Sequence, residues 1–320
     1  MKNKWRLLIA VCVCLSFMTV PVVASAAYPE KPVLAIVPFS PGGGNDILIR
    51  LIAKHITPFL GQSVAVENKP GAGGQIGWTA LSKARADGYT ISVTSLPSMI
   101  LIKLLRDNVP FNLDDFRYVC NIQVDPLIWA VPKDSQFKSA SDIVAYAKAN
   151  PGKLNVAGDG PKSNVQLQEL VIEKTLDIKT NFIPYNGSGP SATALLGNKV
   201  DFAILTLSSA VSHIESGRLV PLVVFNNETV PGIDVKTSKD VFDLDIPSVG
   251  RSLRGIAVPK NVPEDVLKKL ETAFKSVTES PEFLEQAKAL GLIINFMGNE
   301  DAEKAIAESV KTIEEYKNLF

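Results

Sequence analysis

Short apolar runs alternate along the chain with segments in which apolar residues recur at helical spacing, and brief polar turns separate the two. Strands and helices that alternate in this way indicate an α/β fold with mainly parallel sheets. In the first part of the chain the expected strands are 33–39, 64–67 and 89–95, and the expected helices are 46–60, 75–86 and 97–105. Asn45 is expected to cap the first of these helices and Asp46 to stabilise its start.

A second series of strands and helices begins near Pro132. Its expected helices are 141–150, 163–176, 191–196 and 208–216, and its expected strands are 154–157, 181–185, 200–205 and 220–225. Ser163 is placed to cap the second of these helices. A polar, irregular segment follows, and the pattern then predicts a strand over 253–258 and helices over 264–278, 281–290 and 301–320.

Two extended segments, 116–131 and 253–258, can each cross between two lobes. Two crossings allow the C-terminal helices to return to the first lobe. We therefore expect domain 1 to comprise residues 27–125 and 254–320, and domain 2 to comprise residues 126–253. This is the layout of a hinged, two-lobed binding protein that closes around a ligand.

The first 26 residues have the three-part layout of a secretory signal peptide. Three basic residues precede an apolar run over 7–20, and the small residues 24–26 follow it. The run has 14 residues, too few to span a bilayer comfortably, which disfavours the alternative of a membrane anchor. We expect cleavage after Ala26 and a periplasmic location.

The composition is that of a folded globular protein, with 46% apolar and 21% charged residues. Basic and acidic residues each number 33, and loss of three basic residues with the signal peptide gives a charge of −3. A chain without a basic excess lacks the electrostatic footprint of a nucleic-acid-binding protein. Cys12 and Cys14 leave with the signal peptide, and Cys120, in an apolar stretch, is expected to be buried and structural.

The sequence lacks the motifs of several catalytic sites. It has no Gly-x-Ser-x-Gly elbow, no Gly-x-x-x-x-Gly-Lys-Ser/Thr phosphate loop and no complete dinucleotide fingerprint. Its two histidines, His55 and His213, have no neighbouring ligand cluster. We therefore expect no catalytic residue, no metal and no cofactor.

Two glycine-rich turns follow the first two expected strands, and each leads directly into a helix. They carry residues 42–44 and 71–74. Ligands of open α/β sheets bind at the carboxyl ends of strands, and the amide groups of a helix start attract an anion. Side by side, the turns would hold a carboxylate, with Ser95 adding a hydroxyl group and segments 158–164 and 186–191 facing them from the second lobe. For one turn taken alone, the alternative that glycine only permits tight turning stays open.

Six runs of residues carry a resemblance to a known protein family. They are YPEKP at 28–32, VPFSPGGGND at 37–46, VENKPGAGGQIG at 66–77, ADGYT at 86–90, PYNGSGP at 184–190 and SGRL at 216–219. The chain resembles the Bug family, the extracytoplasmic solute receptors of tripartite tricarboxylate transporters. The resemblance covers essentially the whole chain after the signal peptide, and the second and third runs are long and specific to the family.

The resemblance implies a two-domain, type II periplasmic binding-protein fold. It implies a receptor that captures a small carboxylate in the interdomain cleft and delivers it to a membrane permease. The implied ligands are di- or tricarboxylates, acidic amino acids or aromatic acids, and we expect a monomer with no nucleic-acid partner. The expected ligand-binding residues are Ser40, Gly42, Gly43, Gly44, Asn45, Gly71, Ala72, Gly73, Gly74, Ser95, Gly158, Asp159, Ser163, Asn164 and Asn186.

The second lobe departs from the family's pattern. Residues 156–164 read VAGDGPKSN where most members carry a Tyr-Gly-Ser-x-Gly-x-Gly-Ser-like segment. Arg254 and Gly255 stand where a Trp-Phe or Trp-Gly pair is usual. Asp159 and Lys162 could contact a polar or charged group of the ligand, pair with each other, or remain in solvent.

An exported α/β enzyme that acts on an anionic small molecule is the alternative function. It would need a nucleophile or an acid–base pair facing the cleft. The candidates are Asp46, Asp159 and scattered serines, and none has a histidine at a suggestive spacing. A sensory receptor that passes its ligand to a signalling partner would show the same sequence features.

Overall fold

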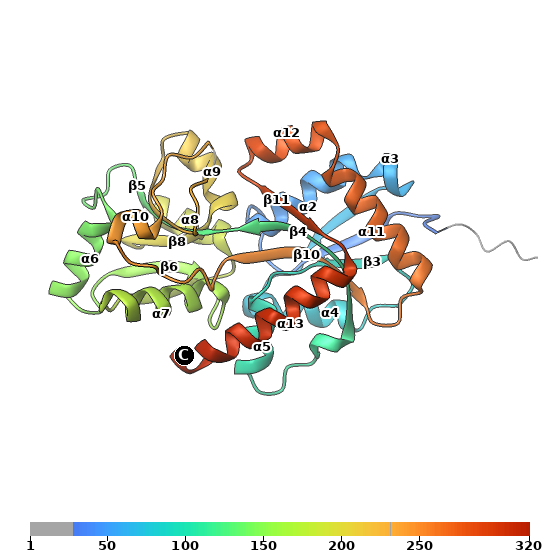
Figure 1. The fold of residues 1–320 in the computed structure, drawn as a ribbon, viewed down its shortest axis with the longest axis horizontal. Helices are drawn as coiled ribbons and strands as arrows, with labels where there is room; N and C mark the ends of the chain where they lie inside the picture. Colours follow the sequence, from blue (N-terminus) through green and yellow to red (C-terminus); the bar gives the residue numbers. More distant parts are fainter. Residues whose placement is uncertain (1–27, 231) are drawn as a thin grey trace, which may run out of the picture.

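The computed structural model describes residues 28–230 and 232–320, so the expected signal peptide and its cleavage site lie outside the described residues. Two lobes lie side by side, and two long strands, β4 (Phe116–Asp125) and β10 (Ser252–Pro259), run between them (Figure 1). The two-lobed α/β architecture expected from the sequence is confirmed. No helix within the described ranges has both the length and the apolar character needed to cross a membrane.

The first lobe is built on a six-stranded sheet with the order β11-β4-β10-β3-β1-β2. Its other strands are β1 Val33–Val37, β2 Val64–Asn68, β3 Thr90–Val93 and β11 Ile293–Met297. The strands of consecutive βα units pair in parallel, β1 with both β2 and β3. The pairs β10 with β3, β10 with β4 and β11 with β4 are antiparallel. The sheet is therefore mixed, because β10 and β11 run opposite to the other four strands.

The second lobe is built on a five-stranded sheet with the order β7-β6-β8-β5-β9. Its strands are β5 Leu127–Pro132, β6 Asn155–Asp159, β7 Asn181–Tyr185, β8 Phe202–Thr206 and β9 Leu219–Phe225. Strand β6 pairs in parallel with β7 and β8, and β5 pairs antiparallel with β8 and β9. Only Pro126 separates β4 from β5, so the chain passes from one sheet to the other without a linker.

Helices cover both sheets. Those of the first lobe are α2 Gly44–His55, α3 Thr57–Leu60, α4 Gln75–Ser82, α5 Ser98–Leu105, α11 Glu264–Thr278, α12 Pro281–Ala289 and α13 Asn299–Tyr316. Those of the second lobe are α6 Ala140–Ala149, α7 Asn164–Leu176, α8 Ser188–Leu196, α9 Leu207–Glu215 and α10 Ser238–Phe242. Single 3₁₀ turns are η1 Ala72–Gly74, η2 Leu113–Asp115 and η3 Lys317–Leu319. Helix α13 reaches from the first lobe toward the second (Figure 1), and Tyr316 and Leu319 pack against core residues of both.

The structure corrects three local expectations. The helix expected over 46–60 is two helices, α2 and α3, because Pro58 lacks an amide N–H and interrupts the hydrogen bonding. Gly43, with an extended backbone, caps α2, and Asn45 lies in the first turn of the helix instead. The apolar pattern also does not predict β11, a half-exposed strand at the sheet edge. Cys120 is buried in β4, as expected.

The core of the second lobe encloses a carboxyl group. The Trp129 ring meets the rings of Phe202 and Phe225 edge to face, at centroid distances of 5.1 and 5.5 Å. The indole N–H of Trp129 donates to Glu169 Oε2 at 2.9 Å, and Thr180 Oγ1 donates to Glu169 Oε1 at 3.2 Å. Burial raises the pKa of Glu169 to about 8, although both hydrogen bonds act to lower it.

We predict that the free energy of unfolding falls less in Glu169→Gln than in wild type as the pH rises from about 5 to about 9. The difference should be about 1 kcal/mol or more. The folded protein keeps the Glu169 proton at a pH where the unfolded chain has released it, so the wild type loses stability as the pH rises through about 8. Glutamine keeps the polar contacts and cannot ionise. Urea denaturation across this range measures the effect, with the exposed Glu285→Gln as control. Parallel pH profiles of wild type and Glu169→Gln would contradict the prediction.

Candidate ligand-binding site

The first glycine turn, residues 40–43, follows β1 and lies against the turn that precedes α8. The N–H of Ser40 donates to the carbonyl of Asn186 at 3.3 Å. A Cβ atom added to Gly189 would lie 2.9 Å from the carbonyl oxygen of Pro41, closer than side chains come to backbone. The two turns therefore meet backbone to backbone across the lobe boundary.

The second glycine turn, residues 71–74, follows β2 and meets the loop that follows β6. Gly71, Gly73 and Gly74 have φ angles of 130°, 63° and 106°, which other residues adopt only with strain. A Cβ atom added to Gly160 would lie 3.0 Å from the Cα atom of Gly73. Each glycine turn of the first lobe thus approaches a glycine of the second lobe.

Two cationic side chains connect the lobes beside the second glycine turn. Arg106 donates from Nη1 to the carbonyl of Ala72 at 2.7 Å and from Nη2 to the carbonyl of Pro161 at 2.6 Å. In return, Lys162 Nζ donates to the carbonyl of Leu105 at 2.6 Å. Each lobe therefore supplies a cation to a carbonyl group of the other.

Asp159, at the end of β6, is buried and accepts a hydrogen bond from Ser188 Oγ at 2.7 Å. Burial raises the pKa of Asp159 to about 6, while the Ser188 bond and the charge of Arg254 act to lower it. Lys162 donates to a carbonyl, and the ion pairs of the described residues do not include Asp159 with Lys162. Burial also excludes the solvated alternative for Asp159. The partner that the structure gives this carboxyl group is Ser188 of the same lobe.

Ser98 and Asn164 connect the lobes beside these turns. Ser98 Oγ donates to Asn164 Oδ1 at 2.5 Å and accepts from the N–H of Asn164 at 3.2 Å. Ser95 is buried after β3, and its carbonyl accepts a hydrogen bond from the N–H of Met99 in α5 at 3.1 Å. These hydroxyl and carboxamide groups lie where the first lobe faces α7.

Three of the expected site residues have a role in the fold itself. Ser163 caps α7, as expected. A Cβ atom on Gly158 would lie 2.5 Å from the ring of Phe182, and one on Gly74 would lie 2.6 Å from the ring of Trp78. Packing therefore accounts for these residue types without a ligand.

Asp46 organises the first glycine turn. Its Oδ2 accepts from the N–H of Gly42 at 3.0 Å, and its Oδ1 accepts from Arg50 Nε and Asn68 Nδ2, each at 2.9 Å. Asp46 thus stabilises the start of α2, as expected. The neighbouring Asn45 is buried, and its Oδ1 has no hydrogen-bond partner in the described part of the chain.

A buried ion pair, absent from the residues expected for the site, lies behind the first glycine turn. It joins Arg254 of β10 and Asp125 of β4, which are 2% and 0% exposed. Asp125 also accepts from the N–H and Oγ of Ser208, in the first turn of α9, at 3.2 and 2.5 Å. Gly44, the first residue of α2, donates its N–H to Ser209 Oγ at 3.0 Å. The starts of α2 and α9, one from each lobe, therefore converge on this pair.

The sequence does contain a signal for this ion pair. Arg254 is the one charged residue in the strand 252–259, and a charge in a buried strand requires a partner. Across residues 28–230 and 232–320, no group of three or more His, Cys, Asp or Glu side chains is arranged to hold a metal ion. The groups that the site offers a ligand are backbone amides, hydroxyls, carboxamides, Asp159 and the ion pair.

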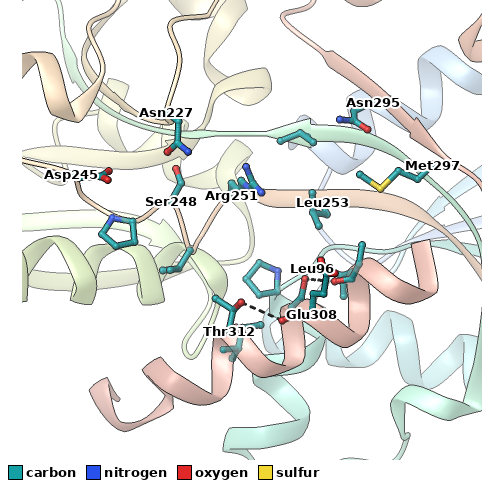
Figure 2. A pocket seen from close by; sticks show the side chains of 17 residues that line it. Leu96, Asn227, Asp245, Ser248, Arg251, Leu253, Asn295, Met297, Glu308 and Thr312 are labelled. Atoms are coloured by element: carbon teal, nitrogen blue, oxygen red, sulfur yellow. Dashed lines mark hydrogen bonds between the residues drawn. The ribbon is translucent and has the colours of Figure 1, made fainter. Parts of the chain in front are cut away.

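A cavity of about 570 Å³ lies on the other face of the crossover strands (Figure 2). Val124 and Leu253 line it, and neighbouring residues of a strand point to opposite faces, so Arg254 points away from this cavity. Arg251 of the second lobe and Glu308 of α13 also line it. The cavity is therefore separate from the meeting place of the glycine turns.

Comparison with known proteins agrees with this geometry. Residues 48–317 match the family described as the Tripartite tricarboxylate transporter family receptor, TctC. The protein BugT of Bordetella pertussis is 34% identical over 230 residues, which cover 71% of this chain and 70% of BugT. The structure of the periplasmic binding protein BugD has a TM-score of 0.84 at 28% identity, covering 92% of this chain and 97% of BugD. MatC from Rhodopseudomonas palustris, with bound malate, has a TM-score of 0.81 at 25% identity, covering 91% and 99%.

Two lobes, two crossover strands and turns that meet between the lobes define a solute-binding protein. The chain belongs to the TctC family of tripartite tricarboxylate transporter receptors, whose members are solute-binding proteins. The resemblance to the Bug proteins seen in the sequence is thereby confirmed.

We predict that Gly44→Ala destabilises the contact between the lobes. The added Cβ atom would overlap the Arg254 guanidinium and Ser208 Oγ, and both groups are held by Asp125. The free energy of unfolding should fall by about 1 to 3 kcal/mol, as for other overpacked sites. Gly43→Ala is the matched control, because its nearest neighbour would be 3.6 Å from the Cβ atom. Urea denaturation compares the two variants, and equal stability would contradict the prediction.

Proposed function

We propose that the protein captures a small carboxylate between its lobes and delivers it to a tripartite tricarboxylate-type membrane permease. The observation that carries this proposal is the meeting of two glycine turns of the first lobe with glycines of the second. Glycine turns that lead into helix starts present backbone N–H groups, which bind a carboxylate without a basic side chain. A hinge lets the turns separate to admit a ligand and meet again around it.

The ligand contacts that we assign lie on both lobes. In the first lobe they are the turns 40–45 and 71–74, and across the cleft they include Asp159, Asn164 and Asn186. The malate bound to MatC supports a small carboxylate as the ligand, and the classes that we consider are di- and tricarboxylates, acidic amino acids and aromatic acids. The periplasmic BugD supports a periplasmic location for this protein.

Binding without turnover is part of the proposal. An enzyme would need a nucleophile or an acid–base pair facing the cleft, and the carboxyl groups that could serve are Asp46 and Asp159. Asp46 is held by three hydrogen bonds within the first lobe, and Asp159 by one from Ser188. We therefore assign these carboxyl groups to structure and ligand contact rather than to catalysis.

We predict that at least one acid in a panel of di- and tricarboxylates, acidic amino acids and aromatic acids raises the melting temperature. A ligand that binds only the folded state stabilises it, by about 2.7 kcal/mol at roughly 100 times its dissociation constant. The same acid should be recovered unchanged after incubation, as measured by proton NMR. Conversion of the acid to a product would contradict the proposal.

A glycine variant tests whether the turns form the site. Gly73→Val should abolish the increase in melting temperature, because the side chain would meet Arg106, 3.2 Å from the added Cβ atom, at the lobe contact. Gly152→Val is the matched control, because Gly152 has a similar φ of 71° but no atom within 4 Å of its Cβ position. Normal binding by the folded Gly73→Val variant would show that this turn is not the site.

We predict that the protein is exported and loses its first 26 residues. Intact-mass measurement of protein from the periplasmic fraction should give an N-terminus near Ala27. Recovery of the uncleaved chain from a membrane fraction would contradict both the cleavage and the periplasmic location.

A further inference from the structure

Arg254 is a buried arginine that uses only part of its hydrogen-bonding capacity. Its Nη1 donates to Asp125, to Gln123 Oε1 at 3.1 Å and to Ser208 Oγ at 3.1 Å. Its Nε is buried and has no hydrogen-bond partner among the residues that the structure describes. A guanidinium has five N–H donors, and here three acceptors share one nitrogen. The edge formed by Nε and Nη2 is engaged by none of these three acceptors.

This edge has the geometry of a carboxylate-binding group. The N–H bonds of Nε and Nη2 are parallel, and together they bind the two oxygens of one carboxylate. Asp125 does not occupy the edge, because it pairs with Nη1. The ion pair therefore orients the guanidinium and leaves its Nε–Nη2 edge available for bidentate binding of another acceptor.

The guanidinium lies beside the start of α2. A Cβ atom on Gly44 would lie 2.5 Å from Cζ of Arg254, so the helix start and the guanidinium are in contact. Two more buried polar atoms in this region, Asn45 Oδ1 and Gln123 Nε2, lack partners in the described ranges. An unpaired buried polar atom costs about 1–3 kcal/mol. Two of these three atoms, Arg254 Nε and Gln123 Nε2, are donors, so they indicate a place where an acceptor group of a ligand completes the hydrogen bonding, whereas Asn45 Oδ1 requires a donor.

We propose that Arg254 binds a carboxylate of the ligand through its Nε–Nη2 edge, with Asp125 as its counter-charge. This inference rests on the proposed function, and it adds a charged contact to a site otherwise built largely of amides and hydroxyls. Asp125 balances the charge of Arg254, and Asp159 lies within its electrostatic reach. The attraction for a carboxylate therefore depends on directed hydrogen bonds rather than on net positive charge.

The test is calorimetric titration of succinate, L-malate, citrate and L-glutamate into wild type, Arg254→Lys and Arg117→Lys. Lysine keeps the positive charge at this position and removes the Nε–Nη2 edge that can bind a carboxylate in bidentate fashion. Arg117 lies on the other crossover strand, β4, and pairs with the exposed Glu264 at 3.4 Å, so its replacement is the matched control. Each acid that the wild type binds should bind about tenfold more weakly to Arg254→Lys and within about twofold of wild type to Arg117→Lys.

The outcomes separate the inference from the proposed function. Wild-type affinity in the Arg254→Lys variant overturns the inference and leaves the proposed function intact. A wild type that binds none of the four acids overturns the inference, whereas the proposed function is overturned only if the wider panel, which includes aromatic acids, also yields no ligand. If Arg254→Lys does not fold, the double variant Arg254→Met with Asp125→Leu replaces it, because apolar residues of similar volume often substitute for a buried ion pair without loss of folding. The double variant should keep its circular dichroism spectrum and lose binding of these acids, and retained binding overturns the inference.

Discussion

A carboxylate and a guanidinium buried together, Asp125 and Arg254, hold the two crossover strands in one register, because leaving either charge unpaired in the interior costs about 3–5 kcal/mol. The same carboxylate binds the N–H and hydroxyl of Ser208, which fixes the start of α9 in the second lobe. The guanidinium lies against Gly44, which begins α2 in the first lobe. One ion pair thus determines where the helix starts of both lobes meet.

Glycine is the residue type that this meeting requires. A side chain at Gly44 would overlap the ion pair, and side chains at Gly160 or Gly189 would press on the backbone of the opposite lobe. Because backbone atoms of one lobe contact backbone atoms of the other, the groups that face the cleft are mainly N–H groups and small polar side chains. Backbone N–H groups can hold an anion without a basic excess, which agrees with the proposed capture of a carboxylate by a chain with equal numbers of acidic and basic residues.

Local features of the fold could be predicted from the sequence, and long-range ones could not. Helix α11 and strand β7 match their expected bounds because periodicity and caps are encoded in neighbouring residues. The two glycine turns were recognisable for the same reason, although their partners Gly160 and Gly189 depend on how the lobes pack. Asp125 and Arg254 are 129 residues apart, and their pairing depends on the register of β4 and β10, which no local pattern specifies. The hydrogen bond from Lys162 to the Leu105 carbonyl could not be predicted from the sequence, because every residue has a backbone carbonyl group.

The exchanged bonds of Arg106 and Lys162 have a kinetic consequence. Separation of the lobes must break both the bond from Arg106 to the Pro161 carbonyl and the bond from Lys162 to the Leu105 carbonyl, so each bond adds to the barrier for opening. Their acceptors are uncharged carbonyl groups, for which dissolved ions compete less effectively than they do for the partners of an exposed ion pair. Opening of the lobes at this contact should therefore depend less on salt than the breaking of an exposed ion pair would.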